Sequence, residues 1–173
     1  MNFAQHIRSV PDFPKKGIVF RDITTLLKNP RAFSAAVDAL ADHFNNSGAN
    51  IIVGPESRGF IFGAALAYKM KLSFVPVRKP GKLPAETVSE TYLLEYGSDT
   101  IEMHKDAVKS GDKVLLIDDL LATGGTMEAA CRLVEKLGGI IVGIGFLIEL
   151  SFLPGREKLR KYPVFTLIDY KTE

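Results

Sequence analysis

Two adjacent carboxylates, Asp118 and Asp119, end an apolar run and are followed by a glycine-rich turn. The residues of that turn are Ala122, Thr123, Gly124, Gly125 and Thr126. Glycine leaves backbone N–H groups accessible, and the start of a helix attracts an anion, so the turn suits a phosphate group. Carboxylates accept hydrogen bonds, so the two aspartates suit the hydroxyls of a ribose. The spacing predicts a ribose 5-phosphate site, with the phosphate on the turn and the diol on the acids.

The same stretch also has a purely structural interpretation. In addition, residues 114–126 lack the motifs of other nucleotide-binding sites. An aspartate pair before a helix can simply cap it, and Gly-Gly can form an ordinary turn. A P-loop would carry a lysine that reaches the β- and γ-phosphates, and a dinucleotide fold would carry GxGxxG. Residues 114–126 contain neither signature. This favours a monophosphate over a triphosphate or a dinucleotide.

The surrounding pattern alternates buried strands with helices. Short, continuously apolar segments predict strands, and apolar residues at i, i+3 and i+4 predict helices. Strands are expected at residues 51–54, 73–78, 113–118, 140–150 and 163–168, and helices at 2–9, 30–46, 59–70 and 124–138. The fold class is therefore α/β, with an open, mostly parallel sheet and flanking helices.

We expect a single domain over residues 1–173, with two irregular parts. Residues 1–30 form an N-terminal arm, in which 13–24 mix turn residues with a short apolar segment. Residues 79–104 break the alternation and predict a loop followed by a hairpin that turns near Gly97. Because a long break of this kind is typical of functional loops, we expect residues 79–104 to act as a flexible lid.

Three polar clusters follow the predicted strands, at the edge of the sheet where ligands bind in such folds. Residues 118–126 follow the third strand. The other clusters are Glu56, Ser57, Arg58 and Gly59 after the first strand, and Arg78, Lys79 and Lys82 after the second. We expect the three clusters to converge on one crevice, although basic residues in loops are also commonly solvated surface charges.

Composition narrows the class of protein. The net charge is +2, which does not predict a nucleic-acid partner. The one cysteine, Cys131, rules out an intrachain disulfide and is expected to be a buried thiol. No apolar run approaches the roughly 20 residues of a membrane span. We expect a cytoplasmic protein without membrane or nucleic-acid partners.

The stretch VLLIDDLLATGGT resembles the phosphoribosyl-pyrophosphate (PRPP) motif of type I phosphoribosyltransferases. Further segments, GIVFRDIT, GPESRGFIFG, VPVRKPGKLP, YLLEYG and GREKL, are similar in order and spacing to family members that act on adenine. The resemblance covers nearly the whole chain. It implies purine salvage, in which the 5-phosphoribosyl group passes from PRPP to N9 of adenine and yields AMP and pyrophosphate. A different base (hypoxanthine, xanthine or orotate) and a PRPP-binding regulator without turnover are the alternatives.

The resemblance also implies roles for individual residues. Asp118 and Asp119 would bind the ribose hydroxyls and act as catalytic residues, and residues 122–126 would bind the 5-phosphate. Pyrophosphate would be bound by Glu56, Ser57, Arg58, Gly59, Arg78, Lys79 and Lys82. Adenine would be bound by Val19, Phe20, Arg21 and Leu150.

Glu95 in the lid would be the acid/base group near the purine. Mg²⁺ would be held mainly by substrate and water, with Asp118 and Asp119 beside it or in direct contact. A non-proline cis peptide is implied at Glu56–Ser57. Part of the Arg78–Lys82 cluster would reach a neighbouring subunit, which implies a homodimer, and residues 1–30 would form a small hood over the site.

Overall fold

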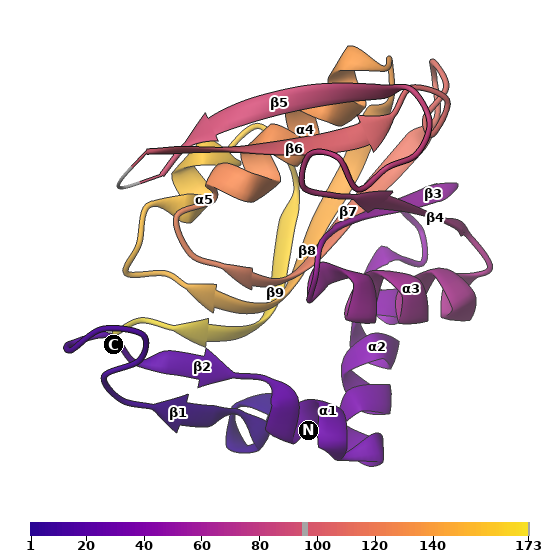
Figure 1. Ribbon diagram of the computed structural model, residues 1–173. Helices are drawn as coiled ribbons and strands as arrows, with labels where there is room; N and C mark the ends of the chain where they lie inside the picture. Colours follow the sequence, from indigo (N-terminus) through magenta and orange to yellow (C-terminus); the bar gives the residue numbers. More distant parts are fainter. Residues whose placement is uncertain (95–96, 173) are drawn as a thin grey trace.

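The computed structural model describes residues 1–94 and 97–172. Its centre is a five-stranded parallel sheet in the order β4-β3-β7-β8-β9 (Figure 1). The strands are β3 (Ile51–Pro55), β4 (Ser73–Val77), β7 (Lys113–Leu121), β8 (Ile140–Leu150) and β9 (Val164–Tyr170). All five predicted strands are confirmed. β7 continues past the predicted end at residue 118, because Leu120 and Leu121 pair with Ile148 and Glu149 of β8. The aspartate pair therefore lies inside the strand.

Helices cover both faces of the sheet, as predicted. The long ones are α2 (Pro30–Phe44), α3 (Gly59–Met70) and α4 (Gly125–Lys136), and the short ones are α1 (Thr24–Lys28) and α5 (Gly155–Lys158). Side chains alternate along β7, so Leu116 packs with α4 in one core cluster while Leu115 packs with α2 and α3 in the other. The start of α2 follows from its sequence, since Pro30 opens it and Asn29 caps it.

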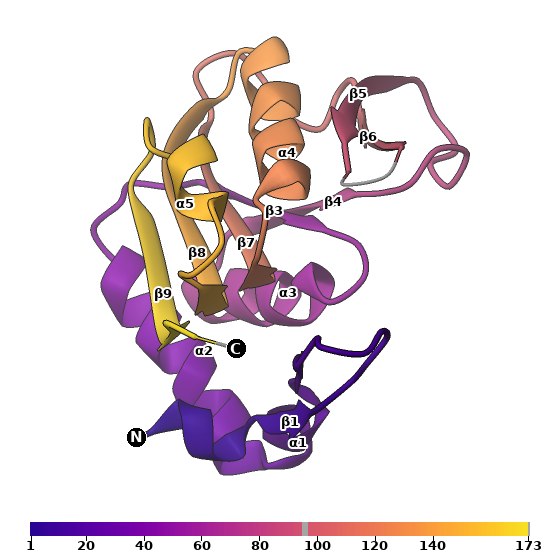
Figure 2. The ribbon, with the colours of Figure 1, turned by 90° about the vertical axis from the view of Figure 1, so that its left-hand side faces the viewer.

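The N-terminal arm lies below the carboxyl ends of β7, β8 and β9 (Figure 2). It contains β1 (Arg8–Val10) and β2 (Phe20–Asp22), which pair antiparallel. The helix predicted over residues 2–9 is only a short 3₁₀ helix, η1 (Phe3–His6). It stops there because the next residues extend to pair with β2, and Arg8 donates to Asp22 at 2.5 Å.

The predicted hairpin is present and lies on the α4 side of the sheet (Figure 1). Its strands are β5 (Thr87–Leu93) and β6 (Ser98–His104), paired from Thr87–His104 to Leu93–Ser98. Arg132 of α4 bonds Glu90 of β5 at 3.2 Å, which ties the hairpin to the helix. No helix in the described parts of the chain is long and apolar enough to cross a membrane.

Candidate active site

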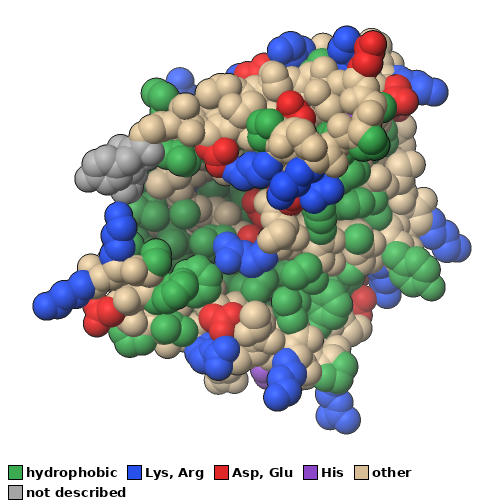
Figure 3. Space-filling view, viewed as in Figure 1, with side chains coloured by type: hydrophobic (Ala, Val, Ile, Leu, Met, Phe, Trp, Pro, Cys, Tyr) green, Lys and Arg blue, Asp and Glu red, His purple; other side chains and the backbone are tan. Residues whose placement is uncertain are grey.

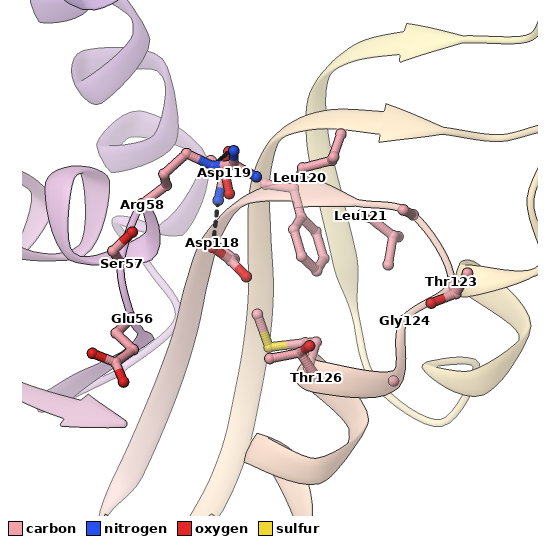
Figure 4. A pocket seen from close by; sticks show the side chains of 14 residues that line it. Glu56, Ser57, Arg58, Asp118, Asp119, Leu120, Leu121, Thr123, Gly124 and Thr126 are labelled. Atoms are coloured by element: carbon pink, nitrogen blue, oxygen red, sulfur yellow. Dashed lines mark hydrogen bonds and ion pairs between the residues drawn. The ribbon is translucent and has the colours of Figure 1, made fainter. Parts of the chain in front are cut away.

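A cavity of about 330 Å³ lies at the carboxyl ends of β3 and β7 (Figures 3 and 4). Its lining consists of Glu56, Ser57, Arg58, Asp118, Asp119, Leu120, Leu121, Ala122, Thr123, Gly124, Gly125, Thr126, Met127 and Phe146. Two of the three predicted polar clusters therefore share one cavity. The residues of the third cluster do not line it, but they bond to Glu56, which does.

The acidic pair is fixed by contacts with the loop after β3. Asp119 is buried, and its Oδ2 lies 2.6 Å from Nε of Arg58. Oδ1 of Asp118 accepts the N–H of Asp119 at 2.8 Å. A Cβ on Gly59 would lie 2.9 Å from Oδ1 of Asp118, so glycine is what lets α3 start this close. Figure 4 shows both acids between Arg58 and the turn.

Burial dominates the ionisation of this pair. It raises the pKa of Asp118 well above its usual range, and the neighbouring charge of Asp119 raises it further. Burial also raises the pKa of Asp119, although the Arg58 guanidinium opposes this. Among the described residues, no cationic side chain hydrogen-bonds to Asp118. Hydroxyl donors or a cation brought by a substrate would stabilise its charged form.

The glycine-rich turn leaves the start of α4 open to an anion. Gly124 adopts a left-handed conformation (φ +77°) at the N-cap and supplies no side-chain cap. The N–H groups of the first turn of α4 therefore have no capping side chain, and the helix dipole adds partial positive charge. This is the arrangement that the sequence predicts for the 5-phosphate.

The basic cluster after β4 is held by Glu56. Its Oε2 accepts from Nη2 of Arg78 at 3.1 Å and from Nζ of Lys82 at 3.1 Å, while Oε1 accepts the N–H of Lys79 at 2.6 Å. Burial of Glu56 works against its charge, but these three donors outweigh burial and lower its pKa. Glu56 thus holds Arg78 and Lys82 next to the cavity that it lines. The predicted non-proline cis peptide at Glu56–Ser57 is present.

A chain of polar contacts joins the turn to the hairpin. Thr126 donates from Oγ1 to the hydroxyl of Tyr92 at 3.0 Å, and that hydroxyl donates to Asp99 at 3.2 Å. Asp99 also forms an ion pair with Lys79. Sequence reasoning assigned Thr126 and Lys79 but missed Tyr92 and Asp99. Strand alternation marks Tyr92 as an inward residue of a hairpin, yet does not indicate that it faces α4.

The four residues predicted to bind adenine are outside the described lining of the cavity. Arg21 stacks on the Tyr170 ring at 4.0 Å and donates to Ser9 at 2.5 Å. Phe20 lies closer to the site, since the guanidinium carbon of Arg58 is 5.6 Å from its ring centre. The other two are Val19, just before β2, and Leu150, which is half-buried at the end of β8. Their role in base binding stays a prediction.

Two further sequence expectations concern Glu95 and Cys131, and the structure adds Phe146 to the site. Glu95 lies outside the described residues. Cys131 is buried in α4, as predicted, and burial raises the pKa of its thiol to about 12, which makes the thiol a poor nucleophile. Phe146 lines the cavity but was missed, because only the register of β8 reveals that it sits beside Asp118.

Comparison with known proteins identifies the family. A model described as the phosphoribosyl transferase domain matches residues 22–171. An adenine phosphoribosyltransferase of Desulfitobacterium hafniense (strain Y51) is 57% identical over 170 residues, which are 98% of each chain. The crystal structure of adenine phosphoribosyltransferase from Thermoanaerobacter pseudethanolicus is 55% identical, with a TM-score of 0.94 and 96% coverage of both chains. The chain belongs to the adenine phosphoribosyltransferase family.

Membership of the adenine phosphoribosyltransferase family confirms the resemblance inferred from the sequence motifs. It also confirms the α/β fold with a parallel central sheet and the expectation of a transferase. A more distant member from Giardia lamblia, crystallised with 9-deazaadenine, is 38% identical with a TM-score of 0.91 and covers 99% of each chain. The fold is thus shared across widely separated members.

Proposed function

We propose that the protein transfers the 5-phosphoribosyl group of PRPP to N9 of adenine, giving AMP and pyrophosphate in purine salvage. The observation that carries this proposal is the cavity in which an acidic pair faces the uncapped start of α4. Relatives at 57% and 55% identity are adenine phosphoribosyltransferases. This favours adenine over other bases, and turnover over a PRPP-binding regulator.

In this proposal the turn and the acidic pair bind the two ends of the ribose 5-phosphate unit. The phosphate takes the N–H groups of residues 122–126, and the ribose hydroxyls donate to Asp118 and Asp119. N9 of adenine attacks C1 of the ribose as the bond from C1 to pyrophosphate breaks. Positive charge builds on the ribose during this step, and the two carboxylates stabilise it electrostatically.

The leaving pyrophosphate would be stabilised by the basic groups around Glu56. Arg58 projects from the loop after β3, while Arg78 and Lys82 are already gathered by the Glu56 carboxylate. The sequence resemblance assigns Glu56 to pyrophosphate binding as well. Because Glu56 is itself an anion, we propose that it serves pyrophosphate indirectly, by positioning the two cations. Ser57, Gly59 and Lys79 complete the predicted set through the loop backbone and added charge.

We propose that Mg²⁺ accompanies PRPP. In the described parts of the chain no group of three or more His, Cys, Asp or Glu residues is placed to hold a metal. The cavity does offer the paired carboxylates of Asp118 and Asp119, which are the hard oxygen ligands that Mg²⁺ prefers. This fits an ion held mainly by pyrophosphate, ribose hydroxyls and water, with the aspartates beside it. When bound, the ion would neutralise charge on the leaving group.

The base would enter between the arm and the lid. We propose that backbone groups near Val19 read the adenine edge, with Phe20, Arg21 and Leu150 around the ring. Glu95 would take the N9 proton. Residues 79–104 would close over the site as a lid and exclude water from the ribosyl centre.

We further propose a cytoplasmic homodimer in which residues 1–173 form one domain. The dimer and the location rest on the family resemblance. The basic cluster after β4 would be the part of each subunit that approaches its neighbour. Sedimentation at micromolar protein concentration tests the dimer, and a monomer at that concentration would contradict it.

Turnover tests the proposed activity directly. The protein is incubated with PRPP, Mg²⁺ and, in separate reactions, adenine, hypoxanthine, xanthine or orotate, and nucleotide and pyrophosphate are measured. We expect equal amounts of AMP and pyrophosphate with adenine. Product with another base and none with adenine would overturn the assignment of adenine. Absence of product with every base, despite PRPP binding, would favour the regulator.

A further inference from the structure

The segment GREKL, which carries no role in the reaction described above, contains α5, and α5 packs against the phosphate turn. We infer that Gly155, Arg156 and Glu149 act together as a buttress that fixes the backbone of this turn and so sets its affinity for a sugar phosphate. The inference rests on the proposed binding of the 5-phosphate by residues 122–126.

The backbones of α5 and the turn meet without room for a side chain. A Cβ on Gly155 would lie 2.2 Å from the carbonyl oxygen of Ala122 and 3.0 Å from Cδ1 of Leu121. From the other side, a Cβ on Gly124 would lie 2.7 Å from the carbonyl oxygen of Gly155. Two glycines from different elements thus allow a backbone-to-backbone contact. The turn has no free space in the direction of α5.

Helix α5 needs contacts outside itself to hold its position against the turn. It has only four residues and no side-chain cap, and a helix so short is not stable by itself. Arg156 supplies the support: its Nε donates to Oε1 of Glu149 at 2.7 Å, and its Nη2 donates to Oε2. This bidentate pairing fixes both the distance and the orientation of the Arg156 guanidinium relative to the Glu149 carboxylate. Nη1 of Arg156 also donates to the carbonyl oxygen of Val164 at 3.2 Å.

Glu149 is well placed to transmit rigidity from the sheet. It is 4% exposed, and Oε2 also accepts from Thr166 of β9 at 3.1 Å. Within the sheet Glu149 is the register partner of Leu121, which is the last residue of β7 before the turn. The turn is therefore held at its root by the Leu121–Glu149 pairing and from behind by α5, which the same glutamate anchors.

The buttress positions the site and is not part of its surface. None of its three residues belongs to the described lining of the cavity, which includes the whole of residues 118–127. Its effect should therefore fall on binding of the sugar phosphate. The proton transfer at the base and the affinity for adenine should be little changed. This pattern separates positioning from general stability.

The test is Gly155→Ala, which pushes a methyl group against the Ala122 carbonyl. Titration calorimetry measures the affinity of the folded protein for ribose 5-phosphate, and kinetics measure KM for PRPP and for adenine. We expect ribose 5-phosphate to bind about tenfold more weakly and KM for PRPP to rise by about as much, with KM for adenine within about twofold. Gly111→Ala is the control, because Gly111 has φ +87° and open space around it, so alanine strains the chain far from the turn.

A second variant keeps the inference falsifiable if Gly155→Ala does not fold. Arg156→Lys keeps a charge near Glu149 but loses the bidentate contact, so we expect a smaller loss of ribose 5-phosphate affinity in the same direction. Folded Gly155→Ala or Arg156→Lys protein with wild-type affinity would overturn the buttress. Since calorimetry needs only binding, absence of turnover by the wild type would count against the proposed function alone.

Discussion

The Nε atom of Arg58 lies 2.6 Å from Oδ2 of Asp119, so the loop after β3 is tied to the acidic pair of β7. Two regions that are 61 positions apart in the chain (119 − 58) thus form one wall of the cavity. The contact leaves Asp118 as the acid without a cationic hydrogen-bond partner among the described residues. A pyrophosphate bound by Arg58 would therefore either displace Asp119 from the guanidinium or share the guanidinium with it.

The acidic pair should be essential for PRPP use. In Asp118→Asn/Asp119→Asn protein, the ribose hydroxyls lose two anionic acceptors and the ribosyl cation loses its stabilising charge. We expect kcat/KM for PRPP to fall by roughly a hundredfold or more, measured as AMP formation at fixed adenine. Asp106→Asn, an exposed residue in the turn after β6, is the control. Wild-type kcat/KM in a folded double variant would refute the ribose role.

The hydroxyl of Tyr92 should matter for the turn. Tyr92→Phe keeps the ring that a Cβ on Gly125 would meet at 3.1 Å, but removes the bonds to Thr126 and Asp99. We expect the free energy of unfolding to fall by about 1 kcal/mol, and kcat/KM for PRPP to fall a few-fold. Chemical denaturation and steady-state kinetics measure the two effects. Tyr68→Phe is the control, because Tyr68 is 89% exposed; equal effects of the two substitutions would contradict a specific role for Tyr92.

Glu95 is predicted from the resemblance to act on the purine nitrogen. Glu95→Gln removes the proton acceptor while keeping the size of the side chain. We expect kcat to fall by about a hundredfold with little change in KM for adenine. Glu86→Gln provides a matched change at an exposed glutamate near the start of the hairpin. If Glu95→Gln weakens only the binding of adenine, the acid/base role is wrong.

Asp22 should make stability depend on pH. The Thr24 N–H and then the Arg8 side chain lower the pKa of Asp22 from 3.8 to about 2. A lowered pKa means that the folded state favours the charged form, so the stabilisation is present above pH 4 and is lost as the pH falls toward 2. We expect the free energy of unfolding of the wild type to exceed that of Asp22→Asn by about 1–2 kcal/mol at pH 6. This difference should narrow as the pH approaches 2. Urea unfolding across this range measures it, and a gap that stays constant with pH would contradict the assignment.

Much of the fold follows from local sequence pattern. The runs at 51–54 and 140–150 are apolar and rich in β-branched residues, which favours buried strands, and Pro30 and Asn29 mark the start of α2. The structure of residues 2–9 does not follow from their composition, which allows a helix. Only the pairing of Arg8–Val10 with β2 decides against a helix there. Tertiary pairing therefore overrode the local preference.

The candidate site, too, can be predicted from the sequence only in part. Asp118, Asp119 and the turn are contiguous, so their chemistry is readable from residue type and spacing. The contacts of Arg58 with Asp119, of Glu56 with Lys82, and of Tyr92 with Thr126 join distant segments. Their geometry depends on strand order and register, which spacing along one chain does not encode.

A crystal structure with AMP bound tests the central claim most directly. We predict that the phosphate accepts hydrogen bonds from N–H groups of residues 122–126 and that the ribose hydroxyls donate to Asp118 or Asp119. The base should lie beside Val19 and Phe20. Phosphate bound at the Glu56–Lys82 cluster, or a ribose that does not contact either aspartate, would contradict the account.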